Sequence, residues 1–254
     1  MRPRVLVLAG LEPSGMAGLL ADLAAVDWLG GRGLGVATAL TAQGGRFLCR
    51  PVPPTVVRAQ ISALQSTGPI HAVKLGMVPT RQVLKSIRQA LHGVKAPWVV
   101  DPVVRTSQKE RLSSLSRRDY LALASPQVVL TPNLDEAGWL LGTRRALRTV
   151  EAAERAGRAL LDAGFGAVVV KGGHLPHRPV DVVCTPQGSL LLGATRLQGR
   201  TRAYRGTGCR FASVMAVTLA RGEEVSTAAK LAKAQVRKFL RRSILGARHR
   251  AESS

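Results

Sequence analysis

Short apolar runs alternate with longer amphipathic segments along this chain. The short runs are rich in Val, Leu and Ala and have the length of strands, whereas the segments between them repeat apolar residues at intervals of three and four, as helices do. Strands are predicted at Val5–Ala9, Gly35–Leu40, Ala72–Leu75, Trp98–Asp101, Val128–Thr131 and Ala167–Val170. Helices are predicted at Ala17–Leu29, Thr55–Gln65, Arg81–Leu91, Leu134–Leu141 and Val150–Ala163.

Strands that are apolar throughout and separated by helices are typical of a parallel sheet covered on both faces. Two further runs, Asp181–Thr185 and Ser189–Gly193, flank a Pro-Gln-Gly turn and predict a hairpin at the edge of the sheet. The last two helices are predicted at Cys209–Leu219 and at about 226–247. Because no linker or internal repeat interrupts the pattern, we predict one α/β domain over residues 1–254.

Composition excludes several classes of protein. No apolar run approaches the ~20 residues of a membrane span, and the start of the chain reads as a buried strand because Gly10 and Glu12 cut its apolar part short. The three cysteines are scattered and odd in number, which argues against a disulfide framework or a metal-ligand motif. We therefore expect a cytoplasmic protein without a membrane anchor.

The formal charge of +22 comes from 37 Lys and Arg against 15 Asp and Glu. A nucleic-acid partner is one interpretation. However, the basic residues are spread along the chain, and aromatic residues at 4% are too few for base-stacking platforms. Specific nucleic-acid binding is therefore not expected, although weak polyanion binding is compatible with this charge. The densest basic group is predicted to be a solvated face of the last helix: Lys230, Lys233, Arg237, Lys238, Arg241, Arg242, Arg248 and Arg250.

A Gly-Thr-Gly turn leads directly into the helix predicted from Cys209. Glycines let several backbone N–H groups point at one place, and the positive end of the helix dipole adds to them, which suits a phosphate. A cysteine at such a helix start, between Arg205 and Arg210, is expected to have a lowered thiol pKa and to serve as a base or nucleophile. The turn taken alone is equally compatible with a tight bend and a cysteine that fills the core.

Polar or glycine-rich loops follow each predicted strand. In parallel α/β sheets ligands bind beyond the carboxyl ends of the strands, so these loops are expected to meet at one site. Each is weak evidence alone, since Asn133 could simply cap a helix with Glu136 as its partner. Together they are a stronger signal: Gly10–Gly18, Thr41–Gly45, Gly76-Met77, Asp101-Pro102-Val103, Thr131–Glu136 and Lys171–His174.

In these motifs the chain resembles the hydroxymethylpyrimidine/phosphomethylpyrimidine kinases of thiamine biosynthesis, which belong to the ribokinase-like superfamily. Pyridoxal and pyridoxine kinases have similar motifs. The resemblance extends in order from about Val5 to Phe239. The segments that carry it are Pro13-Ser-Gly15, Ala17-Gly18, Ala21-Asp22, Leu40-Thr-Ala-Gln43, Val73-Lys-Leu-Gly-Met77, Val100-Asp-Pro-Val103, Thr131-Pro-Asn-Leu134, Glu136-Ala137, Val170-Lys-Gly-Gly-His174 and Gly206-Thr-Gly-Cys209.

The resemblance implies a three-layer ribokinase-like fold without a large lid domain, ATP and Mg²⁺ as cofactors, and a homodimer. It implies that the hydroxymethyl group of 4-amino-5-hydroxymethyl-2-methylpyrimidine, or its monophosphate, accepts the phosphoryl group. The implied roles are the anion hole for Gly206, Thr207 and Gly208; base for Cys209; Mg²⁺ ligands for Asp101 and Glu136; nucleotide contacts for Asn133, Lys171 and Thr207; and acceptor contacts for Gln43, Met77, Val103, Gly10 and Ala17.

The chain departs from the family pattern mainly around the acceptor. Glu12 stands where Asp is usual and Met16 where Gly is usual, while Gly44 and Gly45 replace Asn-Thr. Arg205 takes the place of a customary His. Two alternatives therefore stay open besides the pyrimidine kinase. One is a vitamin B6-type kinase or a catalytically weakened pyrimidine-binding homologue, and the other is a basic protein that interacts with nucleic acid.

Overall fold

The computed structural model describes residues 2–43, 47–106, 110–143, 145–197 and 204–252. Within these residues nine strands form one sheet in the order β3-β2-β1-β4-β5-β6-β7-β8-β9. The strands from β2 to β7 in this order run parallel, and β3, β8 and β9 are antiparallel to their neighbours. The strands are β1 (Arg4–Leu11), β2 (Arg32–Ala42), β3 (Leu48–Pro51), β4 (Ala72–Leu75), β5 (Trp98–Val100), β6 (Val128–Leu130), β7 (Ala167–Val170), β8 (Val180–Thr185) and β9 (Gly188–Gly193).

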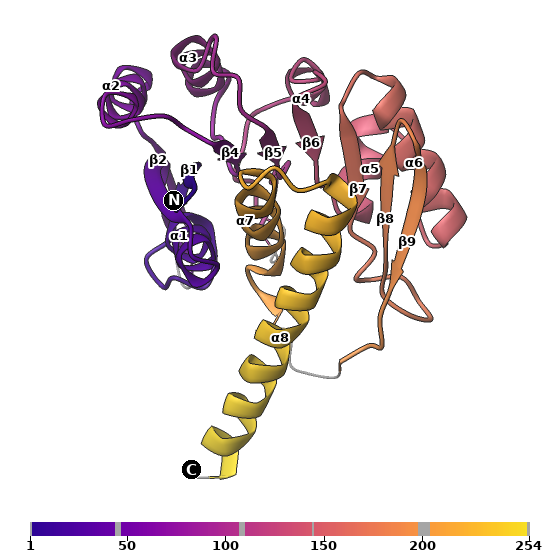
Figure 1. The fold of residues 1–254 in the computed structure, drawn as a ribbon. Coiled ribbons are helices and arrows are strands. Elements are labelled where there is room, and N and C mark those ends of the chain that lie inside the picture. Colours follow the sequence, from indigo (N-terminus) through magenta and orange to yellow (C-terminus); the bar gives the residue numbers. More distant parts are fainter. Residues whose placement is uncertain (1, 44–46, 107–109, 144, 198–203, 253–254) are drawn as a thin grey trace.

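Helices cover both faces of this sheet (Figure 1). One face packs against α2 to α6, and the other packs against α1, α7 and α8. The prediction of a mostly parallel sheet between two helical layers is therefore confirmed. The helices are α1 (Gly18–Trp28), α2 (Pro54–Gln65), α3 (Arg81–Ala90), α4 (Arg117–Leu121), α5 (Leu134–Leu141), α6 (Val150–Asp162), α7 (Thr207–Leu219) and α8 (Val225–Glu252).

Strand β1 illustrates why the predicted strands are apolar throughout. Its side chains alternate between the two faces, so Leu6 and Leu8 join the core under α2 to α6, whereas Val5 and Val7 join the core under α1, α7 and α8. All four are fully buried. A polar residue at any of these positions would be enclosed by apolar neighbours, which explains the unbroken hydrophobic run.

The predicted elements are present, with shifted ends. β2 is longer than predicted, α7 begins at Thr207 instead of Cys209, and α8 continues to Glu252. The short elements β3 and α4 were not predicted. The four residues of β3 lie at the sheet edge and are mostly exposed, so they show no buried pattern.

Helix α8 packs along α7 and extends beyond the rest of the fold (Figure 1). Part of its predicted solvated basic face makes specific contacts. The cationic groups of Lys238 and Arg242 lie 5.7 and 4.8 Å from the ring centre of Trp28, and Lys233 Nζ lies 2.8 Å from Asp181 Oδ2. None of the helices in the described part of the chain is long and apolar enough to cross a membrane.

Candidate active site

The chain leaves the sheet in opposite directions from β1 and β4, which are neighbours in its centre. Such a switch point opens a crevice beyond the carboxyl ends of the two strands. Gly10 at the end of β1 and Met77 just after β4 meet there, because a Cβ on Gly10 would lie 2.6 Å from Met77 Cε. The absence of a side chain at Gly10 thus makes room for Met77. Both were predicted to line the acceptor pocket, and the fold brings them together.

The Gly-Thr-Gly turn lies against the loop after β1. Gly206 is the N-cap of α7 with φ of 72°, and a Cβ at this position would lie 1.9 Å from Met16 O. Glycine is therefore required both by the left-handed backbone and by the close approach. Arg210 Nη1 donates to Met16 O at 2.8 Å. These contacts bring the N-terminus of α7 next to that of α1, where the predicted acceptor residue Ala17 is the N-cap.

Lys171 and Asp101 form an ion pair beside this turn. Lys171 Nζ lies 2.6 Å from Asp101 Oδ1, and both side chains are largely buried. A Cβ on Gly208 would lie only 3.1 Å from Lys171 Nζ and 3.7 Å from Asp101 Oδ2. The N-terminal turn of α7, the ammonium and the carboxylate thus occupy one place. The fold thus brings together three residues predicted for the site: Gly208, Lys171 and Asp101. Because the carboxylate of Asp101 would repel an anion, this place suits a phosphate when a cation neutralises that carboxylate.

Glu136 and Asn133 are held in a capping box at the start of α5. Asn133 Oδ1 accepts from the Glu136 N–H at 2.9 Å, and Glu136 Oε2 accepts from the Asn133 N–H at 2.7 Å. The helix-cap interpretation of Asn133 is therefore confirmed. Burial raises the pKa of the Glu136 carboxyl to about 7; the charge of Lys171 lowers it, whereas that of Asp101 raises it further.

The expected low pKa of Cys209 is wrong. Burial raises the pKa of this thiol to about 11, and the negative charge of Asp22 acts in the same direction. The positive charge of Lys74 and the Gly18 N–H oppose the rise without overcoming it. The adjacent arginines are engaged elsewhere: Arg210 stacks 4.0 Å from the ring centre of Phe239, and Arg205 reaches toward β2.

A buried ion pair lies beneath the start of α7, and its role was not predicted. Lys74 Nζ lies 2.6 Å from Asp22 Oδ2, and both side chains are fully buried. Ser213 Oγ donates to Asp22 Oδ1 at 2.8 Å. Although burial opposes its charge, the carboxylate of Asp22 raises the pKa of Lys74. The pair therefore links β4, α1 and α7 one helical turn below Cys209.

The acceptor end of the site combines an apolar wall with a polar cluster. Met77 and Val103 pack in one small apolar cluster with Phe47, Cys49 and Leu112. The last three were not predicted, since they come from an edge strand and a loop with no signal of their own. The polar cluster contains Gln43, whose Oε1 accepts from Arg205 Nη2 at 2.6 Å. The departures at Gly44 and Gly45 lie outside the described residues.

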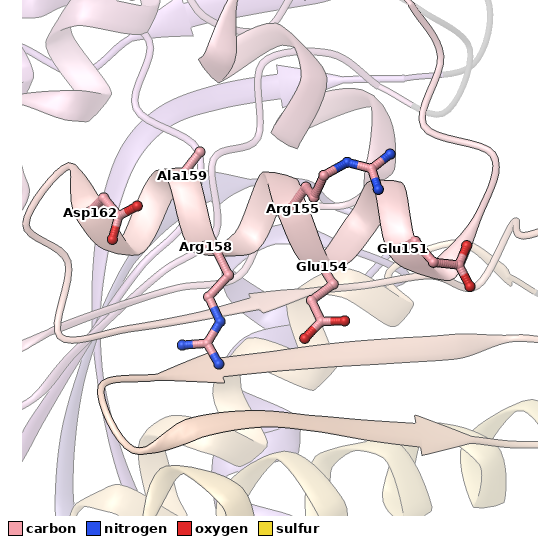
Figure 2. Close-up of a pocket in the computed structure, with 6 residues that line it drawn as sticks. All are labelled: Glu151, Glu154, Arg155, Arg158, Ala159 and Asp162. Carbon is pink, nitrogen blue, oxygen red and sulfur yellow. The ribbon is translucent and has the colours of Figure 1, made fainter.

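A surface hollow of about 390 Å³ lies elsewhere, along α6 (Figure 2). Its walls are charged side chains of both signs from a single helix, and Arg158 extends toward the β8–β9 hairpin, where Nη1 donates to Thr185 O at 3.1 Å. No sequence-predicted site residue lines it. The concentration of glycine turns and buried charges at the switch point therefore remains the candidate active site.

Comparison with known proteins decides the family. Residues 12–251 match the family model described as phosphomethylpyrimidine kinase. The chain belongs to the phosphomethylpyrimidine kinase family. It is 36% identical over 238 residues to a hydroxymethylpyrimidine/phosphomethylpyrimidine kinase of Streptomyces coelicolor, a match that covers 92% of this chain and 87% of that protein. The predicted resemblance is therefore confirmed, and the protein is a kinase.

Solved structures of this family and of a related one have the same fold. A phosphomethylpyrimidine kinase of Clostridium difficile has a TM-score of 0.79 and 27% identity, covering 93% of this chain and 99% of that chain. A Staphylococcus aureus pyridoxal kinase in complex with AMP-PCP and pyridoxal has a TM-score of 0.82 and 29% identity, covering 93% and 87%. The fold is thus ribokinase-like, and fold alone does not separate the two acceptors.

Proposed function

We propose that the protein transfers the γ-phosphoryl group of ATP to 4-amino-5-hydroxymethyl-2-methylpyrimidine and/or to its monophosphate, in thiamine biosynthesis. The observation that carries this proposal is the meeting of Gly206–Gly208, Lys171 and Asp101 at the carboxyl end of the sheet. Phosphoryl transfer depends mainly on positioning and on stabilisation of negative charge. Backbone N–H groups at a helix start, next to a buried ammonium, supply that stabilisation.

The nucleotide side of the proposal uses Asn133, Lys171 and Thr207. The amide of Asn133 and the ammonium of Lys171 donate to nucleotide phosphates, and the backbone N–H of Thr207 adds to the anion hole. Thr207 Oγ1 donates to Tyr204 O at 2.9 Å, which fixes the turn. Within the described residues these donors lie on three separate elements, so ATP would bind where β6, β7 and α7 meet.

Mg²⁺ fits the residues present. Asp101 and Glu136 are hard oxygen donors near the carboxyl ends of the neighbouring strands β5 and β6. Asp101 pairs with Lys171, and Asn133, the capping partner of Glu136, forms a backbone bridge with Lys171. Two carboxylates with remaining positions for water and phosphate are what Mg²⁺ commonly uses in kinases. Bound Mg²⁺ neutralises charge on the phosphoryl group that is transferred. Asp101 and Glu136 would hold it, and Lys171 balances the charge of Asp101 when it is absent.

Cys209 is the proposed base for the hydroxymethyl proton. With a pKa of about 11 the thiol is protonated at neutral pH, so it becomes a base only if substrate binding lowers that pKa. Lys74 and the Gly18 N–H are the groups that favour the thiolate. The monophosphate is different, because its phosphate is largely dianionic at pH 7 and has no proton to give up. Cys209 is therefore needed for the alcohol and dispensable for the monophosphate.

The acceptor side is formed by Gln43, Met77, Val103, Gly10 and Ala17. Gln43 forms hydrogen bonds with the edge of the pyrimidine, and Met77 and Val103 pack against the ring. Gly10 and Ala17 let the ring approach the backbone near the start of α1. The second candidate acceptor is a vitamin B6 alcohol, which is favoured by the likeness to pyridoxal kinases.

One assay separates these acceptors. The purified protein is incubated with ATP and Mg²⁺ and with the pyrimidine alcohol, its monophosphate or pyridoxine, and the products are identified by mass. Phosphorylation of either pyrimidine compound supports the proposal and counts the transfers. Phosphorylation of pyridoxine alone would replace it with the second candidate. ATP binding without any product would indicate a weakened homologue.

We further propose that residues 1–254 fold as a single kinase domain and that the protein is a cytoplasmic homodimer. The continuous sheet, whose strands come from all parts of the described chain, supports the single unit. Light scattering coupled to size exclusion tests the dimer directly. A mass of about 27.0 kDa in solution, that of one chain, would contradict it.

A further inference from the structure

Arg205 lies between the predicted acceptor pocket and the anion-binding turn. It directly precedes Gly206, and its side chain points back toward the loops after β1 and β2. Arg205 Nη2 donates to Gln43 Oε1 at 2.6 Å and lies 3.7 Å from Glu12 Oε1. Its side chain is 22% exposed. A guanidinium is thus held between the anion-binding turn and Gln43, one of the predicted acceptor residues.

The guanidinium is only partly satisfied by its neighbours. Of its five N–H donors, one forms a hydrogen bond within the described residues, and the 3.7 Å separation from Glu12 is too long for another. Glu12 instead accepts from the Ser14 N–H at 3.1 Å and from Ser14 Oγ at 2.5 Å. Arg205 therefore keeps donors for a ligand.

Arg210, on the other side of the turn, provides the contrast. Its Nη1 donates to two backbone oxygens, Met16 O at 2.8 Å and Gly206 O at 3.3 Å, and its guanidinium stacks on Phe239. These contacts join the turn to the loop after β1 and to α8. Arg210 therefore has a structural role, whereas Arg205, with the same charge and a position five residues away, faces the acceptor.

We propose that Arg205 is a specificity-determining residue that recognises a phosphate on the acceptor, so that this protein prefers a phosphate monoester to the free alcohol. The inference rests on the function proposed above. A guanidinium binds phosphate oxygens in a two-pronged geometry that an alcohol cannot use. It also offsets the repulsion between a dianionic acceptor and the phosphates of ATP.

The reaction favoured by Arg205 needs no base. An oxygen of the acceptor phosphate bonds to the γ-phosphorus, and the bond between that phosphorus and the β,γ-bridging oxygen breaks. ADP leaves with the electron pair, and the acceptor becomes a diphosphate. Arg205 stabilises the anionic acceptor in the ground state and in the transition state, while Gln43 stays oriented on the ring.

The test compares kcat/KM for the alcohol and for its monophosphate in the wild type and in Arg205→Met. We expect a loss of about 30-fold with the monophosphate and of about 3-fold with the alcohol, because removal of a charged partner costs far more than removal of one orienting hydrogen bond. Arg205→Lys should restore part of the monophosphate activity, since it keeps the charge without the fork. Arg210→Met is the matched control and should affect both acceptors alike.

Two outcomes would overturn the inference. One is an equal loss with both acceptors in Arg205→Met, and the other is a selective loss in Arg210→Met. Calorimetric binding of the two compounds without ATP gives a further test that does not depend on turnover. Equal affinity of the wild type for the alcohol and the monophosphate would overturn the role of Arg205, whereas a preference for the monophosphate without turnover of either compound would overturn the proposed function alone.

Discussion

Replacement of Lys74 by Met should destabilise the fold strongly, although Met fills a similar volume. The ammonium is fully buried and 2.6 Å from Asp22 Oδ2. Its removal leaves a buried carboxylate for which, within the described part of the chain, Ser213 is the remaining side-chain hydrogen-bond partner. Loss of one member of a buried ion pair typically costs about 3–5 kcal/mol. The carboxyl avoids a larger cost by taking up a proton, which at pH 7 requires about 4 kcal/mol for a group with an ordinary pKa of ~3.9.

Protonation of Asp22 in the variant determines how its free energy of unfolding changes with pH. In Lys74→Met the native carboxyl of Asp22 is protonated, while the unfolded carboxyl is ionised above its ordinary pKa. The native state then binds more protons, so the stability of the variant falls as pH rises, by about 1.4 kcal/mol per unit between pH 5 and 7. The difference from the wild type should accordingly shrink toward pH 5.

The double variant Asp22→Leu/Lys74→Met should recover most of the loss, because apolar residues of similar size often replace a buried ion pair without penalty. Ser213 keeps a partner, since a helical serine can bond a carbonyl in the preceding turn. Urea unfolding at pH 5, 6 and 7 measures all three proteins. A chain of this length loses roughly 2–4 °C in melting temperature per kcal/mol, so Lys74→Met should melt about 8–16 °C lower at pH 7.

The reasoning fails if Lys74→Met costs less than ~1 kcal/mol at pH 7, since typical losses for a broken buried pair are several-fold larger. It also fails if the deficit is independent of pH, or if the double variant is no more stable than Lys74→Met. Each of these results would mean that water or a rearranged side chain satisfies Asp22.

Three further variants test the site and the fold. Cys209→Ala should lower kcat for the pyrimidine alcohol by at least ~100-fold, within the usual range for a general base, while ATP affinity and turnover of the monophosphate stay within a few-fold. Gly208→Ala should lower kcat about 10-fold, because the added Cβ would lie 3.1 Å from Lys171 Nζ, yet it should not lower the melting temperature, since Ala is the better helix former. Asp119→Asn should cost about 1 kcal/mol through the capping box of α4. This loss should shrink in acid, because Arg81 lowers the pKa of Asp119 to about 2 and the stabilisation by the ionised carboxylate is lost as pH falls from ~4 toward that value.

Simple controls decide these three cases. Cys184→Ala, in β8 and away from the site, should leave the ratio of alcohol to monophosphate turnover unchanged. An equal fall with alcohol and monophosphate in Cys209→Ala would remove the thiol from the mechanism. Unchanged kcat in Gly208→Ala would show that the Lys171 ammonium can move freely. A deficit of Asp119→Asn that persists at pH 2 would mean that packing, not charge, is responsible.

The order of strands and helices could be predicted because nearly every buried strand is apolar on both faces. What could not be predicted depends on contacts between distant residues. The five-residue helix α4 needs its capping box with Ser116 and the bidentate pair of Asp119 with Arg81, which lies in α3. The box lies within one local stretch of sequence, but no local pattern reveals the distant partner Arg81.

The candidate active site, too, could be predicted only in part from the sequence. Sequence order predicted that Gly10, Met77, Asp101 and Lys171 share one edge of the sheet, because strand ends in a parallel sheet must share an edge. The 206–208 turn joins them through the start of α7. The electrostatics of Cys209 could not be derived in this way. Two flanking arginines suggested a thiolate, but Arg205 and Arg210 point to other partners, and burial dominates. Burial of the thiol, rather than its neighbours in sequence, decides the pKa of Cys209.

The second apolar core has a consequence for synthesis of the protein. Strand β1 is among the first parts of the chain to be made, yet Val5 and Val7 are covered by α7, which lies close to the other end. At ~5–20 residues per second, ribosomes need roughly 10–40 s to reach α7 after β1. For that time one apolar face of the nascent sheet is covered by α1 alone and lacks α7 and α8, so part of its core stays exposed to water. A fragment that stops before Gly206 would contain all nine strands of the described sheet but lack α7 and α8, and we expect it to aggregate.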